Sequence, residues 1–243
     1  MTVRCPIVFL LDVDNTLLDD DAVQQDVGDR LERDFGLTAR DRYSRILQDL
    51  SAEFGFRDYL GALQRYRIEH PSETELLSLS SFLIEYPFGE RLFPAALDVL
   101  KRLRKLAPTV ILAEGDVVLQ ARKLERAGLS ETVEGRLLIY TGWEMALDGV
   151  ERRYPAEHYV LVDDKLRALA AAKKSWGGGV TTVFARQGGH HARASKALRA
   201  CPPVDVTITR IGDLLGDLPR LWTARQLIPR IQAREMAALT PAE

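Results

Sequence analysis

Hydrophobic residues fall into two patterns along this chain, short unbroken runs and longer stretches with helical spacing. The unbroken runs are rich in β-branched residues, as is typical of strands that a parallel sheet buries on both faces. They lie at residues 6–11, 109–113, 136–140, 158–162 and 180–185, and residues 204–208 form one further candidate for an edge strand.

Helical patterns occupy the segments between most of these runs. A helix with a wide apolar face starts at Phe93-Pro94 and stops at Pro108, and others are predicted at 117–127, 144–153 and 165–175. Asp116 is placed to cap the second of these, and the glycines at 177–179 are typical of a helix terminator and turn. Strands that alternate with helices predict an α/β fold, a doubly wound parallel (Rossmann-like) sheet.

A different block separates the first strand from the helix at Phe93. Its apolar residues recur mainly every three or four positions, as in amphipathic helices that pack on one another, and Thr38 or Asp41 could cap one of them. About 75 residues are too many for a loop. We therefore predict a core domain of residues 1–18 and 93–243, with an inserted all-helical subdomain of residues 19–92.

Composition narrows the class of protein. The chain has 243 residues, 46% of them hydrophobic, and a net charge of −2, so nothing indicates disorder, nucleic-acid binding or membrane binding. Asp12 interrupts the early apolar run before it could serve as a signal sequence, and no run approaches the roughly 20 apolar residues of a membrane helix. Cys5 and Cys201 lie far apart and form no metal or redox spacing. We expect a cytoplasmic protein with no nucleic-acid or membrane partner.

Candidate chemistry lies where two of the predicted strands end. Asp12 and Asp14 follow the first strand one residue apart, and Asp163 and Asp164 follow the strand at 158–162. Because parallel strands end at the same edge, these four carboxylates are expected in one crevice. Such a set of oxygen ligands suits Mg²⁺ together with a substrate phosphate. Isolated loop acids are the alternative, but two close carboxylates repel each other unless a cation is supplied.

The segment Asp12-Val13-Asp14-Asn15-Thr16, followed by Leu17, resembles the first motif of the haloacid dehalogenase-like (HAD) superfamily. Asp163-Asp164 resembles the fourth motif of that superfamily, in the expected order along the chain. The resemblance implies a phosphatase in which the helical insertion is a cap over the active site. It implies that Asp12 is the nucleophile and Asp14 the general acid and base. Mg²⁺ would lie between the Asp12 carboxylate, the Asp14 backbone carbonyl and Asp163 or Asp164.

Two positions depart from the superfamily pattern. The second motif ends its strand with Ser or Thr, whose hydroxyl holds phosphate, and Ala113 is found there. The third motif supplies a Lys, and Trp143 is found where that Lys is expected. Asp14, in contrast, favours phosphoryl transfer, since haloacid dehalogenases lack an acid two residues after the nucleophile. Thr16 is expected to bond to the backbone of its turn.

Substitutes for the missing groups are present in the sequence. Backbone N–H groups of Glu114 and Gly115 could hold phosphate oxygens, and Lys123 is assigned to the phosphate with them. Lys123 or Lys165 could also replace the third-motif Lys, which neutralises the nucleophile and the phosphate. For each lysine a surface position is favoured, as it is for the basic residues of the insertion, Arg57, Arg65 and Arg67.

These observations lead to a Mg²⁺-dependent phosphatase that acts on a small phosphorylated metabolite through an aspartyl-phosphate. The alternative is a catalytically weakened HAD-like protein that binds a ligand or partner. The four acids favour the first, whereas Ala113 and Trp143 favour the second. An apolar stripe near the C-terminus, Leu218, Leu221, Trp222, Leu227, Ile228 and Ile231, is expected to pack on the core or to form a homodimer contact. The segment from Gln187 to His191 is expected to be an ordinary loop.

Overall fold

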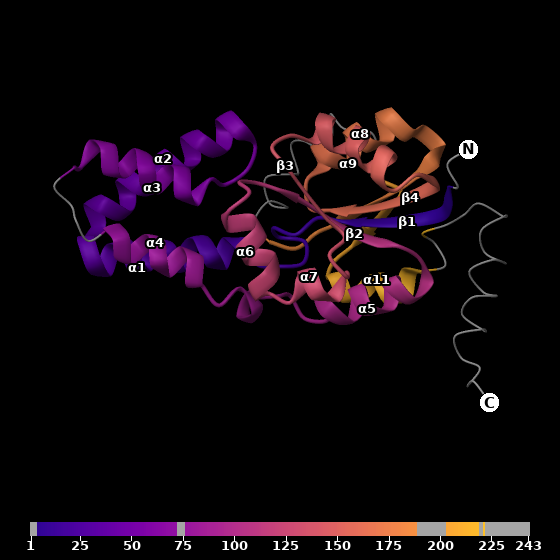
Figure 1. Ribbon diagram of the computed structural model, residues 1–243, viewed down its shortest axis with the longest axis horizontal. Helices are drawn as coiled ribbons and strands as arrows, with labels where there is room; N and C mark the ends of the chain where they lie inside the picture. The colour runs from indigo at the N-terminus through magenta and orange to yellow at the C-terminus, as the bar shows by residue number, and fades with distance from the viewer. Residues whose placement is uncertain (1–3, 72–75, 189–202, 219–220, 222–243) are drawn as a thin grey trace.

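The computed structural model describes residues 4–71, 76–188, 203–218 and 221. Its centre is a parallel sheet with the strand order β3-β2-β1-β4-β5-β6 (Figure 1). The strands are β1 (Cys5–Leu11), β2 (Thr109–Glu114), β3 (Leu137–Tyr140), β4 (Ala156–Asp163), β5 (Val180–Ala185) and β6 (Val206–Ile208). The predicted α/β fold with a parallel, doubly wound sheet is confirmed, with β1 between β2 and β4 at its centre.

Helices cover both faces of the sheet. One face carries α8 (Trp143–Arg153) and α9 (Leu166–Trp176), and the other carries α5 (Ala96–Leu106), α7 (Leu129–Thr132) and α11 (Leu214–Asp217) (Figure 1). Strand β1 packs against both helix layers because its successive side chains point to opposite faces of the sheet. Val8 and Leu10 pack toward α8 and α9, whereas Phe9 and Leu11 pack toward α5, and all four are fully buried.

Four helices form the insertion between β1 and α5. They are α1 (Asp20–Phe35), α2 (Leu37–Phe54), α3 (Tyr59–Glu69) and α4 (Leu76–Glu85), and they extend to one side of the sheet (Figure 1). Tyr43 and Tyr59 are buried among them, and the Tyr43 hydroxyl donates to the Tyr59 carbonyl at 2.9 Å. The apolar interior of this helical block runs without a break into the core under one sheet face. The division of the chain at residues 18 and 93 stays a prediction.

Helix ends differ from the expected ones in three places. Helix α5 begins at Ala96 and not at Phe93, because Ala95 takes a left-handed conformation with φ of 67°. Helix α6 (Leu119–Arg126) begins two residues late, with Val118 and not Asp116 at its N-cap, and the Asp116 carboxylate accepts from the N–H groups of Val118 and Leu119 at the turn before it. The expectation that Thr38 or Asp41 caps a helix is wrong, since both lie inside α2, which begins at Leu37 after the N-cap residue Gly36 and has no side-chain cap.

The sequence patterns did not predict several short elements, because a single helical turn is too short to show a hydrophobic period. They are α7, α11 and the 3-10 helices η1 (Phe88–Arg91), η2 (Gly177–Gly179) and η3 (Ile211–Asp213). Gly177 ends α9 with φ of 53°, as predicted for a terminator. None of the described helices is long and apolar enough to cross a membrane.

Several expectations concern the last part of the chain. Leu218 and Leu221 of the apolar stripe are buried in the core beside α5. The remaining members of the stripe, together with His190, His191 and Cys201, lie outside the described residues. A homodimer contact through this stripe therefore stays a prediction.

The cap of α3 gives a test of how the helical block is held. The Asp58 carboxylate accepts from the Gly61 N–H at 2.7 Å. We expect Asp58→Ala to lower the free energy of unfolding by about 1 kcal/mol, because the first turn of α3 loses this acceptor. Urea unfolding followed by circular dichroism measures the change. The control is Asp41→Ala on the exposed face of α2, and an equal loss in both variants would contradict the capping role.

Candidate active site

Three buried carboxylates meet where β1 and β4 end. Leu11 pairs with Val162, and the Asp12 N–H donates to the Val162 carbonyl at 3.0 Å, so Asp12 lies beside Asp163. Asp12, Asp163 and Asp164 are only 1%, 0% and 3% exposed. Each offers a carboxylate oxygen within 4.8 Å of those of the other two. Three of the four acids that the sequence predicted in one crevice thus form a single cluster of oxygen atoms.

Thr16 ties this cluster together. Its hydroxyl donates to Asp12 Oδ2 at 3.0 Å and accepts from the Asp164 N–H at 3.1 Å. The backbone partner of this hydroxyl thus belongs to the loop after β4, whereas the sequence had predicted a partner in the turn of Thr16 itself. The turn before it depends on Asn15, which has φ of 62°, a conformation that Asn tolerates better than most residues. Thr16 fixes the orientation of the Asp12 carboxylate relative to the loop after β4.

The cluster is electrostatically unbalanced. Asp163 Oδ1 accepts from the Lys165 N–H at 2.7 Å, but Asp163 Oδ2 and both Asp164 oxygens have no hydrogen-bond partner among the described residues. Burial, followed by repulsion from Asp12, raises the pKa of both Asp163 and Asp164 well above its usual value. Burial also raises the pKa of Asp12 to about 7, although Lys165 and Thr16 oppose the shift. Unpartnered buried oxygen ligands that repel one another fit a small divalent cation such as Mg²⁺.

Asp14 is turned away from this cluster and toward α6. Its two oxygens accept from Gln120 Nε2 at 2.7 Å and from Lys123 Nζ at 2.6 Å. Burial and the nearby Asp20 raise the pKa of Asp14, and Lys123 opposes the shift. Two carboxylates one residue apart therefore have different partners. The assignment of the Asp14 backbone carbonyl to the metal stays a prediction.

Lys123 connects Asp14 to the helical block. Its side chain is 3% exposed, and Nζ also donates to Asp20 Oδ1 at 2.8 Å, at the start of α1. Asp20 Oδ2 accepts from Arg57 at 2.7 Å and from the Tyr59 hydroxyl at 3.1 Å. Although burial raises the pKa of Asp20, Lys123 and Arg57 together bring it below its usual value. A buried ion network thus joins α6 to α1 and to the loop between α2 and α3.

The expectation of surface positions for Lys123 and Arg57 is wrong. Arg57 pairs with Asp20 and Asp21 and is largely buried, whereas Arg65 and Arg67 are exposed as expected. A signal for Lys123 was present in the sequence, because it shares the apolar face of α6 with Leu119 and Leu124. Asp20 had no comparable signal, since its side-chain partners Lys123 and Arg57 lie far away along the chain. The assignment of Lys123 to phosphate stays a prediction.

The end of β2 requires a correction. The sequence placed the strand end at Ala113, but β2 continues through Glu114. Because side chains alternate along a strand, Glu114 points to the face shared with Asp12, and Ala113 points to the opposite core with Ile111. The residue at the strand end on the same face as Asp12 is therefore Glu114. The assignment of Ala113 to the second-motif position stays a prediction.

Other substitutes proposed for phosphate binding also change. The Gly115 N–H donates to the Tyr140 carbonyl at 2.9 Å, so the expectation that it binds phosphate is wrong. The Glu114 side chain accepts from Lys165 Nζ at 2.9 Å and from Arg167 Nη2 at 3.2 Å. Lys165 is mostly buried, so its expected surface position is wrong too. Burial lowers the pKa of Lys165, but the negative charges of Asp12 and Glu114 outweigh burial, and the pKa lies above its usual value. Lys165 is therefore a stable cation beside the cluster.

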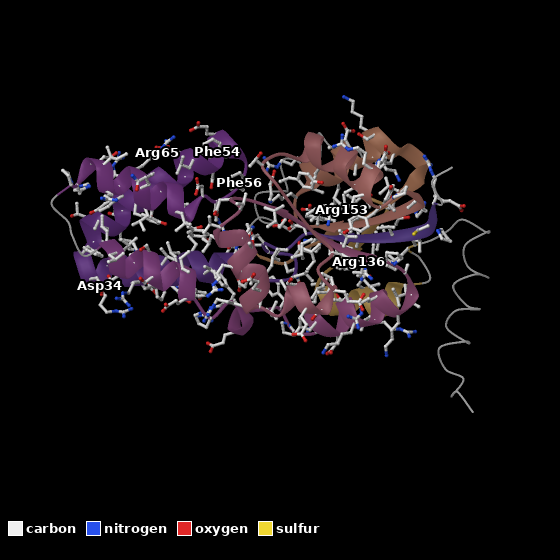
Figure 2. All side chains as sticks on the ribbon, viewed as in Figure 1. Asp34, Phe54, Phe56, Arg65, Arg136 and Arg153 are labelled. Atoms are coloured by element: carbon white, nitrogen blue, oxygen red, sulfur yellow. The ribbon has the colours of Figure 1, made fainter. Side chains whose placement is uncertain are left out.

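A cavity of about 710 Å³ lies between this edge of the sheet and the helical block. Arg167 Nη2 also donates to the Gly55 carbonyl at 2.5 Å and so spans from α9 to the end of α2. Figure 2 shows Phe56 at the end of the helical block nearest the sheet. The lining combines charged and apolar side chains: Asp14, Asp20, Arg57, Asp164, Lys165 and Arg167, together with Leu47, Ala52, Phe56 and Leu166.

Comparisons with solved structures find proteins similar to this chain. A haloacid dehalogenase-like hydrolase of Burkholderia xenovorans LB400 is 53% identical, with a TM-score of 0.85, over 90% of this chain and 100% of that one. An L-2-haloacid dehalogenase of Xanthobacter autotrophicus is 17% identical (TM-score 0.56; 87% and 98% covered). A HAD-hydrolase of Bacillus subtilis bound to magnesium is 19% identical (TM-score 0.61; 89% and 100% covered). The latter two share the fold. Neither the protein-family models nor the curated proteins gave a match.

Removal of Lys123, the cation shared by Asp14 and Asp20, tests the buried ion network. We expect Lys123→Met to lower the free energy of unfolding by about 3–5 kcal/mol, because Asp14 and Asp20 lose a buried partner. Urea unfolding measures this loss, and Lys105→Met on the exposed face of α5 is the control. Addition of Asp20→Asn to Lys123→Met is expected to cost less than the sum of the single changes. A loss below about 1 kcal/mol for Lys123→Met would show that the network carries little stability.

Proposed function

Because this chain belongs to the haloacid dehalogenase-like family of hydrolases, we propose that it hydrolyses the phosphoric monoester of a small metabolite with the help of Mg²⁺. One observation carries the proposal. Asp12 belongs to a buried cluster of carboxylates, while Asp14 is held apart by α6 and lines the cavity. Two acids at this spacing can thus perform different tasks, nucleophilic attack and proton transfer.

The proposed reaction has two steps on these residues. Asp12 attacks phosphorus through a carboxylate oxygen, the bond from phosphorus to the leaving oxygen breaks, and Asp14 gives that oxygen a proton. The product alcohol leaves and the phosphoryl group stays on Asp12. Asp14 then takes a proton from water as the water oxygen attacks phosphorus, which releases phosphate and restores Asp12. Gln120 and Lys123 hold the Asp14 carboxylate for both transfers.

Asp12, Asp163 and Asp164 would hold Mg²⁺, since they offer buried oxygens and three of these have no partner among the described residues. The bound ion would reduce the negative charge of the phosphate before an anion attacks it. Lys165 adds a fixed positive charge beside Asp12 and takes the part of the third-motif lysine. Nothing in this assignment depends on Trp143.

Phosphoryl transfer is favoured over dehalogenation by Asp14. A general acid two residues after the nucleophile has a task only when the leaving oxygen needs a proton, whereas a halide leaves without one. The dehalogenase of Xanthobacter autotrophicus supports the fold alone, because its identity to this chain is 17%. The proposed substrate class is therefore a phosphate ester.

A second candidate function rests on Glu114. A carboxylate at the end of β2, on the same face as Asp12, opposes an anionic substrate unless it is neutralised. The second candidate is a HAD-like protein that binds a phosphorylated ligand without efficient turnover. Turnover distinguishes the two candidates.

Phosphate release from an aryl phosphate and a panel of phosphorylated metabolites tests the first candidate. We expect Mg²⁺-dependent turnover that Asp12→Asn abolishes and Asp14→Asn lowers by at least about a hundredfold. The matched control is Asp98→Asn on the exposed first turn of α5, which should keep full activity. Phosphate binding without turnover in the native protein would favour the second candidate.

Thermal unfolding tests the metal site without any substrate. We expect Mg²⁺ to raise the melting temperature of the native protein, because a ligand that binds only the folded state stabilises it. Asp164→Asn should raise the melting temperature in a chelator, since it removes one of the repelling carboxylates, and should abolish the response to Mg²⁺. Asp98→Asn should respond as the native protein does. An unchanged response of Asp164→Asn would exclude Asp164 from the site.

A further inference from the structure

Glu114 places a buried negative charge at the edge of the sheet where the carboxylate cluster lies. It ends β2 on the same sheet face as Asp12, and its side chain is 6% exposed. Three further carboxylates lie at this edge of the sheet, and each additional negative charge raises the free energy of the others. A buried acid here is tolerated only because cations lie against it.

Two cations of α9 neutralise Glu114. One oxygen, Oε2, accepts both from Lys165 Nζ at 2.9 Å and from Arg167 Nη2 at 3.2 Å. Lys165 is also the cation that most strongly offsets the charge of Asp12. The Glu114 carboxylate therefore shares Lys165 with the proposed nucleophile and also pairs with Arg167.

These cations can also be reached from the cavity. Lys165 and Arg167 both line it, and the Arg167 side chain is 55% exposed. They flank the first residue of α9, an eleven-residue helix whose N-terminal end carries partial positive charge. A phosphoryl group has two negative charges and three acceptor oxygens. It therefore satisfies two donors better than one carboxylate oxygen does.

We propose that Lys165 and Arg167 form the binding site for the phosphoryl group of the substrate, and that the Glu114 carboxylate competes with this group for the same two cations. The substrate class rests on the proposed function, but the competition concerns anion binding alone. Glu114 would then lower the affinity for every phosphate-bearing ligand. Only ligands that gain further contacts in the cavity would then bind tightly.

A structural role for Glu114 predicts the opposite sign. If Glu114 only holds Lys165 and Arg167 in position, its removal weakens phosphate binding, because the two cations lose their fixed geometry. If Glu114 competes, its removal strengthens phosphate binding, because no charge has to be displaced. The sign of the change in affinity therefore decides between the two.

Calorimetric titration with inorganic phosphate at a fixed Mg²⁺ concentration measures this sign. We expect Glu114→Gln to bind phosphate about tenfold more tightly than the native protein and Arg167→Gln about tenfold more weakly. Glu114→Ser, which places a hydroxyl at the strand end, should bind at least as tightly as Glu114→Gln. Glu125→Gln, on the exposed face of α6, is the control and should match the native protein. Melting temperatures establish whether each variant is folded. If Glu114→Gln does not fold, the phosphate affinity of Glu114→Ser gives the sign of the change.

An unchanged or weaker affinity for phosphate in the Glu114 variants would overturn the inference. So would the absence of measurable phosphate binding by both the native protein and these variants. Binding is read without turnover, so the two proposals fail separately. Tighter phosphate binding in a protein without phosphatase activity contradicts only the proposed function. Turnover combined with weaker binding in Glu114→Gln contradicts only the competition.

Discussion

Repulsion among buried carboxylates is the constraint on which the rest of the site depends. Asp12, Asp163 and Asp164 come from two neighbouring strands and offer oxygens within 4.8 Å of one another, almost without access to water. The fold tolerates this because the strands fix their positions and because Thr16 and Lys165 supply a hydrogen bond and a positive charge. The remaining imbalance is what makes the cluster suited to a cation. A site of this kind binds metal at the expense of the stability of the metal-free protein.

Local patterns in the sequence predicted the parts of the protein that depend on local structure. The runs before Asp12 and Asp163 are buried strands because each is apolar on both faces, and their parallel pairing brings the acids together. The ion network escaped prediction because its partners are distant in sequence: Lys123 lies 103 residues from Asp20, and Arg57 lies 37 from it. The end of β2 was placed one residue early. Since side chains alternate along a strand, the added residue, Glu114, lies on the sheet face of Asp12, and Ala113 lies on the opposite face.

The division of work between Asp12 and Asp14 follows from what surrounds each of them. Asp12 continues the direction of β1 and faces Asp163 and Asp164, while Asp14 reaches Gln120 and Lys123 on α6. The second acid is therefore positioned by a helix that follows β2, about a hundred residues later in the chain. Through Asp20 and Arg57 the same network reaches the helical block. Asp14, which would transfer protons, and the helical block, which borders the cavity, are thus joined by one set of ion pairs.

The apolar interior that continues from the helical block into the sheet has a consequence for how this chain can evolve. A cap joined to its core only by two linkers is a module, which recombination can exchange for another without harm to the domain below. Here α4 packs on α6, and one apolar cluster includes Tyr43 of the block and Leu100 beside the sheet. An exchanged block would have to match the surface that it covers as well as the substrate. New specificity in such a chain is therefore expected to arise by substitution within the existing helices.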